Sequence, residues 1–204
     1  FKAHETSEKN IALKKLIASV NRSTHIVQQL LTMNRLVPDL PSVMGFESVN
    51  LIKITRDMLT MLAPKAIEKK LDLEFQADKN TPSFQGNNTA LCILIRNLID
   101  NAIHCTPENG LITVSVKHHK KRAMLEIADN GPGIPNELQA RVFERFFRVI
   151  GNKNSGSGLG LAIVKQIAGL HDAQIELSTP KTHSGLIIRI YFPCSPKHSK
   201  KTIV

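Results

Sequence analysis

Apolar residues recur along this chain with two different spacings, and the spacing changes at prolines and glycines. Between about Ile11 and Val37 they recur mostly every third or fourth residue, which predicts one long amphipathic helix. A lone helix cannot bury such a stripe, so we expect a partner helix in the same chain or in a second copy. Pro38 and Pro41 then end the helical pattern.

The rest of the chain alternates between strand and helix patterns. The predicted strands are 46–50, 71–77, 83–85, 111–116, 123–128, 174–178 and 186–192, and the predicted helices are 51–70 with Pro64 inside it, 89–104, and one that begins at Leu161. We expect an α+β fold, a two-layer sandwich of a mixed sheet of about five strands with about three helices on one face. The expected organisation is a partial helical region at 1–40, a linker at 41–45, a globular domain at 46–193 and a polar basic tail at 194–204.

With 204 residues, 42% of them hydrophobic, the chain can bury one core and a smaller appendage. No apolar run approaches the roughly 18 residues of a membrane span, and nothing resembles a signal peptide. Because the chain begins at Phe1 rather than Met, we expect it to be a piece of a longer protein.

The 27 Lys and Arg residues outnumber the 17 Asp and Glu residues, which gives a net charge of +10. Such a charge suits nucleic acid, but one Tyr, no Trp and no stacking motif argue against that class of ligand. Part of the excess lies in Lys117–Arg122 and Lys197–Lys201, which we interpret as solvated ends of the fold.

Cysteine and histidine spacing does not predict a metal site. Cys92, Cys105 and Cys194 are far apart and form no C-x-x-C pair, which also argues against a disulfide framework. The neighbouring His118 and His119 would point to opposite sides of a strand, with no third ligand nearby in the sequence. We interpret them as part of a solvated turn.

The segment from 129 to 161 carries most of the candidate chemistry. The strand pattern at 124–128 ends at Asp129, so a carboxylate lies at a strand end beside Gly131 and Gly133, which allow a flat ring to approach. Further on, Gly156, Gly158 and Gly160 lead into a helix whose first N–H groups and positive dipole end suit phosphate. The two features predict an ATP site with a mobile lid between them.

A second set of polar residues lies on the predicted helix 89–104. Asn97 and Asn101 are four residues apart, so their side chains share one face, with Arg96, Asp100 and His104 nearby. Carboxamide oxygens suit Mg²⁺, which takes few protein ligands and keeps waters and phosphate oxygens. The alternative is that both amides cap or bridge groups within the core.

The order of these motifs resembles the sensor histidine kinases of bacterial two-component systems, and specifically their ATP-binding domain of the gyrase, Hsp90, histidine kinase and MutL type. Four family boxes have counterparts in order, an asparagine box at Asn97–Ala102, a first glycine box at Asp129–Ile134, a phenylalanine box at Phe143–Arg148 and a second glycine box at Gly156–Leu161. Asn21–Leu36 also resembles the second helix of the family's dimerisation and histidine-phosphotransfer domain. The resemblance covers nearly all of residues 11–193.

The resemblance implies a role for each matching position. Asp129 would accept a hydrogen bond from the adenine amino group, with Gly131, Gly133 and Ile134 around the base, and Asn101 with Asn97 would hold Mg²⁺ against the phosphates. Gly156, Gly158, Leu159 and Gly160 would bind the phosphate tail, Arg145 or Arg148 would steady the γ-phosphate, and residues 135–157 would form the lid.

The chain departs from the family pattern in three places. No histidine has the context of the phospho-accepting residue, since His4-Glu5 does not continue the family box and His25 belongs to the second helix. His104-Cys105 replaces a basic residue and Tyr; His104 can still donate to a phosphate, while Cys105 lacks a ring to pack on the base. Asn87 replaces an Asp, and either residue can cap a helix.

The resemblance implies an ATP-dependent histidine kinase that phosphorylates its own histidine and passes the group to a response-regulator aspartate. The acceptor is expected upstream of Phe1, so this chain is expected not to label itself with ATP. The implied partners are a response regulator receiver domain and a second copy of the parent, a bacterial inner-membrane protein of which this is a cytoplasmic fragment. The alternatives are an anti-sigma-factor-type serine kinase and a non-catalytic nucleotide-binding or dimerisation module.

Overall fold

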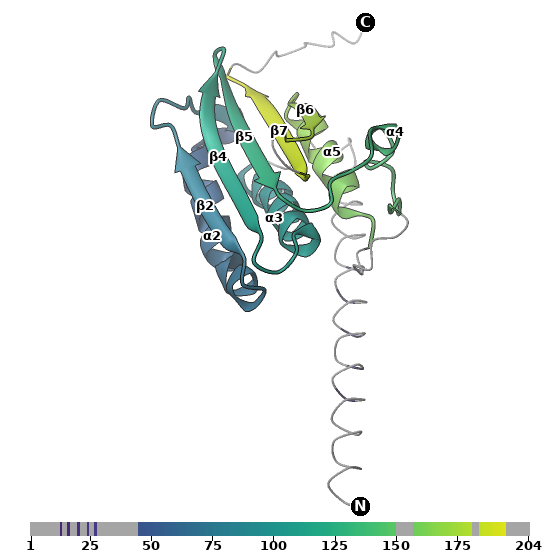
Figure 1. Ribbon diagram of the computed structural model, residues 1–204. Coiled ribbons are helices and arrows are strands. Elements are labelled where there is room, and N and C mark those ends of the chain that lie inside the picture. Colours follow the sequence, from purple (N-terminus) through teal and green to yellow (C-terminus); the bar gives the residue numbers. More distant parts are fainter. Residues whose placement is uncertain are drawn as a thin grey trace, which may run out of the picture.

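The computed structural model describes residues 45–149, 157–180 and 184–194, together with positions 13, 16, 20, 24 and 27. The strands are β1 (Glu47–Val49), β2 (Asp72–Ala77), β3 (Phe84–Gly86), β4 (Leu111–His119), β5 (Arg122–Asp129), β6 (Gln174–Ser178) and β7 (Leu186–Pro193). The helices are α2 (Leu51–Glu68), α3 (Asn88–Cys105), α4 (Asn136–Gln139) and α5 (Gly160–Leu170). This α+β arrangement confirms the predicted fold class (Figure 1).

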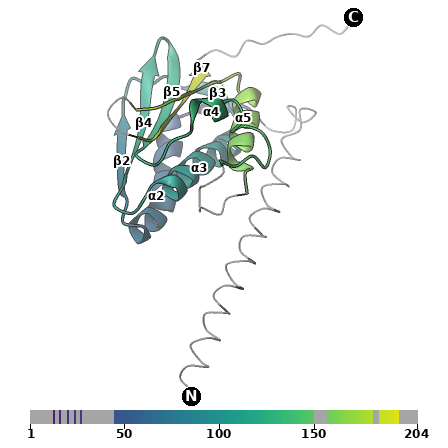
Figure 2. The same ribbon diagram turned by 45° about the vertical axis from the view of Figure 1, so that its right-hand side comes forward.

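Five strands form the main sheet in the order β2-β4-β5-β7-β6. β2 runs parallel to β4 and the other pairs are antiparallel, so the sheet is mixed, as predicted. Helices α2, α3 and α5 lie together on one face, and the core fills the space between the two layers (Figures 1 and 2). The short strands β1 and β3 pair with each other outside this sheet.

The amino ends of the three long helices differ in how they are capped. Asn50 Oδ1 accepts the Lys53 N–H at the start of α2, and Asn87 Oδ1 accepts the Ala90 N–H at the start of α3. Each bond satisfies one of the N–H groups that a helix start leaves without a partner. No side chain caps α5. Of the three helices, α5 is therefore the one whose first N–H groups have no side-chain cap.

In the hairpin between β4 and β5, the strands are longer and the turn is shorter than the sequence pattern predicted. We expected a turn across residues 118–121, but both histidines continue β4, where His119 pairs with Arg122. Only Lys120 and Lys121 form the turn, and both have left-handed φ angles, 44° and 64°. The correction follows from the ladder, because hydrogen bonds to β5 hold the histidines extended despite their polarity.

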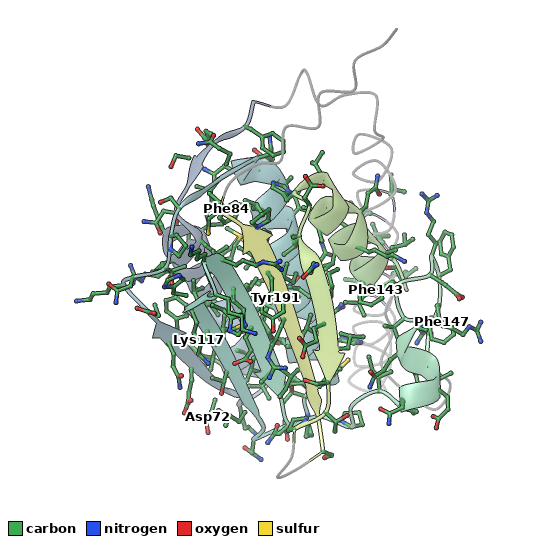
Figure 3. The ribbon with its side chains drawn as sticks, turned by 90° about the horizontal axis from the view of Figure 1, so that it is seen from above. Asp72, Phe84, Lys117, Phe143, Phe147 and Tyr191 are labelled. Atoms are coloured by element: carbon green, nitrogen blue, oxygen red, sulfur yellow. The ribbon has the colours of Figure 1, made fainter. Side chains whose placement is uncertain are left out.

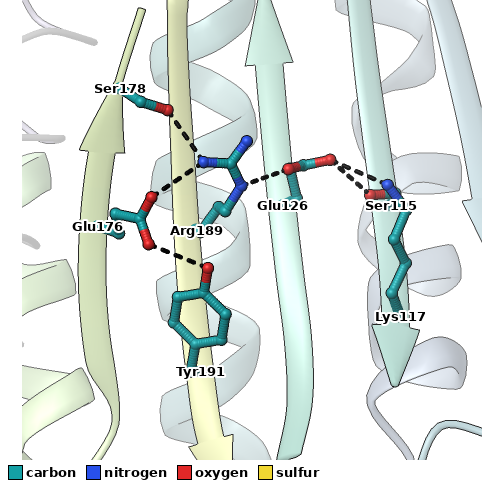
Figure 4. A network of polar contacts seen from close by, with 7 residues as sticks. All are labelled: Ser115, Lys117, Glu126, Glu176, Ser178, Arg189 and Tyr191. Atoms are coloured by element: carbon teal, nitrogen blue, oxygen red, sulfur yellow. Dashed lines mark hydrogen bonds and ion pairs between the residues drawn. The ribbon is translucent and has the colours of Figure 1, made fainter. Parts of the chain in front are cut away.

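The face of the sheet without helices carries a ladder of paired charges (Figure 4). Glu126 Oε2 accepts from Arg189 Nε at 2.6 Å, and Glu126 Oε1 accepts from Lys117 Nζ at 3.1 Å. Arg189 also donates to Glu176 at 3.1 Å, and the Tyr191 hydroxyl donates to the same carboxylate at 3.0 Å. Burial alone would raise the pKa of Glu126, but the hydrogen bonds from Lys117 and Arg189 outweigh it and lower that pKa.

The predicted amino-terminal helix is described at five positions only. All five are helical, and the side chains of Leu13, Leu16, Val20 and Val27 are 54 to 63% exposed. The rest of the predicted helix, residues 41–44 of the linker and the tail from 195 lie outside the described residues. The proposed domain boundaries stay predictions. None of the described helices combines the length and the hydropathy that crossing a membrane requires.

Candidate nucleotide site

Asp129 lies at the end of β5 with a side chain only 7% exposed. Its Oδ1 accepts the backbone N–H of Gly131 at 2.9 Å, which turns the chain sharply after the strand. A methyl group on Gly131 would lie 2.9 Å from the carbonyl oxygen of Cys105. Glycine at 131 therefore lets the end of α3 approach the end of β5, and the two elements enclose the carboxylate.

The carboxyl end of α3 is held by a lysine that the sequence did not single out. Lys69 Nζ, one residue past α2, donates to the carbonyl oxygens of Ile103 at 2.7 Å and His104 at 2.9 Å. Carbonyls in the last turn of a helix have no partner within the helix, and a cation there also suits the helix dipole. The pKa of the neighbouring Cys105 thiol is raised by burial and by the Asp129 charge, although Lys69 opposes the shift.

A second segment missed from the sequence lies directly against Asp129. Gly185, one residue before β7, has a φ of 142°, and a side chain there would collide with the Asp129 carbonyl oxygen. A methyl group on Gly133, whose φ is 72°, would in turn lie 2.6 Å from the Gly185 carbonyl oxygen. Ile134 follows, half-buried. The Ser184-Gly185 pair before a strand was a turn signal, but nothing local indicated which residue it contacts.

Asn97 and Asn101 face the start of α5. A Cβ on Gly160 would lie 3.3 Å from Asn97 Oδ1, and equally 3.3 Å from Oδ1 and Nδ2 of Asn101. The Nδ2 of Asn97 donates to the Ile93 carbonyl at 2.8 Å, which orients its amide oxygen. Asn97 thus bridges within its own helix through nitrogen, as one alternative supposed, and still directs its oxygen toward α5.

The neighbours of the asparagines divide between two faces of α3. His104 is exposed and lies three residues after Asn101, on the same face. Asp100 points elsewhere, since its Oδ1 is 2.8 Å from Lys65 Nζ of α2, and Arg96 Nε is 3.6 Å from its Oδ2. Asn97, Asn101 and His104 therefore share one face of α3, and these three remain the candidate site residues of this helix.

The start of α5 is anchored from both sides. Leu159 is fully buried, so its side chain belongs to the core, while its N–H donates to Ser157 Oγ at 3.2 Å. Gly158 has a φ of 72°, and its carbonyl accepts the Phe146 N–H at 3.0 Å. A methyl group on Gly158 would lie 2.7 Å from the Phe146 carbonyl carbon. The second glycine segment is thus pinned on the phenylalanine segment; Gly156 lies outside the described residues.

The phenylalanine segment sits beyond the edge of the sheet, where Figure 3 shows Phe143 and Phe147 on the α5 side. The Arg141 guanidinium lies 4.6 Å from the centre of the Phe147 ring. Phe146 is 61% exposed and has a left-handed φ of 64°, unusual for a bulky residue. Arg145 and Arg148 are both exposed. The contact with Gly158 comes from the backbone of Phe146; of the predicted lid, positions 150–156 lie outside the described residues.

Residues 86–196 match the model of the histidine kinase-, DNA gyrase B- and HSP90-like ATPase family. The chain belongs to this family. It is 35% identical over 176 residues to the sensor protein kinase PmrB of Pseudomonas aeruginosa and 33% identical over 165 residues to the sensor protein QseC of Escherichia coli. These alignments cover 86% and 81% of this chain but 36% of each relative, so the chain matches about a third of their length.

Solved structures agree with the family. The catalytic domain of the histidine kinase ThkA superposes with a TM-score of 0.67 at 27% identity, covering 75% of this chain and 98% of that domain. The described domain is the ATP-binding catalytic domain of a sensor histidine kinase, and neither the serine kinase nor the non-catalytic alternative is favoured.

Proposed function

We propose that this domain binds Mg·ATP between the end of β5 and the start of α5, and that the parent kinase transfers the γ-phosphoryl group to a histidine and then to a response-regulator aspartate. The observation that carries the proposal is the meeting of Asn97 and Asn101 with the uncapped first residue of α5. Phosphoryl transfer needs mainly positioning and charge neutralisation, which this end of the domain can supply.

At the adenine end, Asp129 accepts the amino group of the base. Its carboxylate is nearly buried and is held in place by the Gly131 N–H. Guanine has a carbonyl at the corresponding position, so GTP would set an acceptor against the carboxylate and leave both without a donor. This mismatch makes the site selective for ATP, with Gly131, Gly133 and Ile134 around the base.

At the phosphate end, Gly158 and Gly160 offer backbone N–H groups, while the buried side chain of Leu159 holds the segment between them in place. The dipole of α5 favours the negative charge. His104, Arg145 and Arg148 are exposed and can donate to the outer phosphates. The donor set fits Mg²⁺, since the amide oxygens of Asn97 and Asn101 converge and phosphate oxygens can complete the shell. Bound Mg²⁺ supplies charge neutralisation on the phosphates.

The partners of the parent follow from its relatives. ThkA has been solved in complex with the response regulator protein TrrA. We propose a response regulator receiver domain as the partner here too. The exposed apolar side chains at positions 13, 16, 20 and 27 support a homodimer through the amino-terminal helix. The parent is proposed to be anchored in a bacterial inner membrane, with this domain on the cytoplasmic side.

Calorimetric titration tests the site. We expect ATP to bind more tightly than GTP, Mg²⁺ to strengthen ATP binding, and Asp129→Asn to weaken it at least tenfold. Asp72→Asn is the matched control, because Asp72 is an exposed carboxylate on β2 at the sheet edge. Equal affinity for ATP and GTP, or an Asp129→Asn variant that binds like the unmodified chain, would contradict the assignment.

A further inference from the structure

The β4–β5 turn gathers positive charge that the nucleotide site does not use. Residues 117–122 read Lys-His-His-Lys-Lys-Arg, without an acidic residue. Lys79 joins them at the same end of the sheet, because the Asp78 N–H donates to the Val116 carbonyl at 2.8 Å. We call residues 117–122 with Lys79 the basic tip. The one acidic neighbour in the adjoining loop is Asp78, whose Oδ1 accepts the Asn80 N–H.

Most of this charge has no counter-charge among the residues that the structure describes. His118, His119, Lys120 and Lys121 are exposed, and within the described residues no ion pair involves Lys79, Lys120 or Lys121. Arg122 donates to Gln174 at 2.6 Å, which is neutral. Of the tip residues, Lys117 is paired, with Glu126, and further along the same sheet face Arg189 pairs with Glu126 and Glu176. Unneutralised charge is thus concentrated at the tip.

The residues of the turn are not those that its backbone conformation favours. Lys120 and Lys121 both occupy left-handed backbone positions, which a two-residue hairpin turn normally fills with Asn and Gly. With lysine at both positions, the two-residue turn carries two long cationic side chains beyond the last ladder pair. Backbone strain of this kind persists where another role favours the residue, and here the role that the residue types share is positive charge.

The shape of the tip defines what it can contact. It is a convex end that extends past the neighbouring elements in Figures 1 and 2. Arg122 pairs with Pro193, so the chain leaves β7 beside the tip, and the basic run Lys197–Lys201 follows in the sequence. Asp129 is at the far end of β5, about 23 Å away. A flat partner could cover the tip without blocking the nucleotide.

We infer that the basic tip is a docking surface for an anionic phospholipid bilayer. A convex cluster of Lys and Arg complements a flat negative surface, whose attraction acts within about one Debye length, roughly 8 to 10 Å in physiological salt. Single-stranded nucleic acid binds in a positively charged groove with stacking aromatic side chains. By the tip, Tyr191 already packs against His119 with the ring centres 5.3 Å apart, and Phe192 is buried. The inference is independent of the nucleotide chemistry.

Vesicle sedimentation with the full chain tests the inference. The probes are vesicles of phosphatidylcholine alone and vesicles of equal parts phosphatidylcholine and phosphatidylglycerol. The variant Lys120→Asn/Lys121→Gly removes two charges and places the favoured residues in the turn, so it should fold at least as well. The control Lys65→Gln/Lys70→Asn removes two exposed charges from the end of α2, near the opposite end of the sheet.

We expect binding to the anionic vesicles only, loss of binding as salt rises, and a partition coefficient about 30-fold lower for the turn variant. The control variant should bind within about threefold of the unmodified chain. Equal losses in both variants would mean that net charge alone acts, and would overturn the inference. So would absence of vesicle binding, or a turn-dependent affinity for duplex DNA or RNA that exceeds the affinity for vesicles at equal salt.

Discussion

His171 Nε2 accepts the backbone N–H of Asn87 at 3.0 Å, although the two residues are 84 positions apart. Asn87 caps α3, and His171 follows the last residue of α5, so the bond joins the two helices that carry the candidate site. The Nδ1 of His171 lies 2.8 Å from the Ile167 carbonyl. This pattern assigns a neutral ring that donates from Nδ1 and accepts at Nε2.

This bond predicts a pH dependence of stability. Burial lowers the pKa of His171, even though the Ile167 carbonyl and Asp172 oppose the shift. Below about pH 6.5 the unfolded chain therefore takes up a proton at His171 before the folded chain does. As the pH is lowered from there, the free energy of unfolding decreases by up to about 1.4 kcal/mol per pH unit. Above that pH the contribution is complete.

Urea denaturation at a series of pH values measures the effect. His171→Gln should lose this part of the pH dependence, whereas His118→Gln, which changes an exposed histidine, should keep it. An unchanged slope in His171→Gln would contradict the assigned protonation state.

Glu126 predicts a second loss of stability at lower pH. Its pKa is lowered in the fold because hydrogen bonds from Lys117 and Arg189 outweigh burial. The stability it contributes is therefore present above its ordinary pKa of 4.5 and is lost as the pH falls through the lowered folded value. Glu126→Gln should cost about 2 kcal/mol at neutral pH and flatten this acid limb.

Glu74 provides the comparison, because it is an exposed glutamate on β2, the edge strand of the same sheet. Glu74→Gln should change the free energy of unfolding by less than about 0.5 kcal/mol. The charge ladder is refuted if both glutamate variants unfold alike in acid.

Alanine substitutions at Gly160 and Gly169, both in α5, should have different effects on ATP affinity and on stability. A methyl group at Gly160 would lie 3.3 Å from the amide atoms of Asn97 and Asn101, whereas nothing lies within 4 Å of the same group at Gly169. Gly169→Ala should stabilise the domain by about 0.5 to 1 kcal/mol and leave ATP affinity unchanged. Gly160→Ala should fold comparably but weaken ATP binding about tenfold, as measured by calorimetry. If Gly160→Ala keeps full ATP affinity, the placement of Asn97 and Asn101 at the phosphate site is wrong.

Lys69 predicts a coupling between the end of α3 and the nucleotide. Lys69→Met leaves the carbonyls of Ile103 and His104 without their cation, so it should lower the free energy of unfolding by about 1 kcal/mol and weaken ATP binding severalfold. Lys70→Gln is the control, since Lys70 is exposed and its ion-pair partner among the described residues is Glu108, at 3.7 Å. If Lys69→Met leaves ATP affinity unchanged, as Lys70→Gln is expected to, the end of α3 does not position the base.

Patterns that depend on neighbouring residues were predictable from the sequence. Strand alternation located the five strands of the main sheet, because side chains that alternate between core and solvent leave a local period of two. The capping role of Asn87 and the shared face of Asn97 and Asn101 also followed from short-range geometry. The β4–β5 turn was predicted too long, because strand pairing kept His118 and His119 extended where their polarity indicated a turn.

The sequence by itself thus determined the α+β class, the order of the elements and the residue types able to handle a nucleotide. Only the tertiary structure decided which of them meet. It set Gly185 against Asp129, Lys69 on the end of α3, and both asparagines against Gly160. These contacts join segments far apart in the chain, and packing of the helices on the sheet selects them. No local period records such a choice, because the free energy that makes it comes from the whole core.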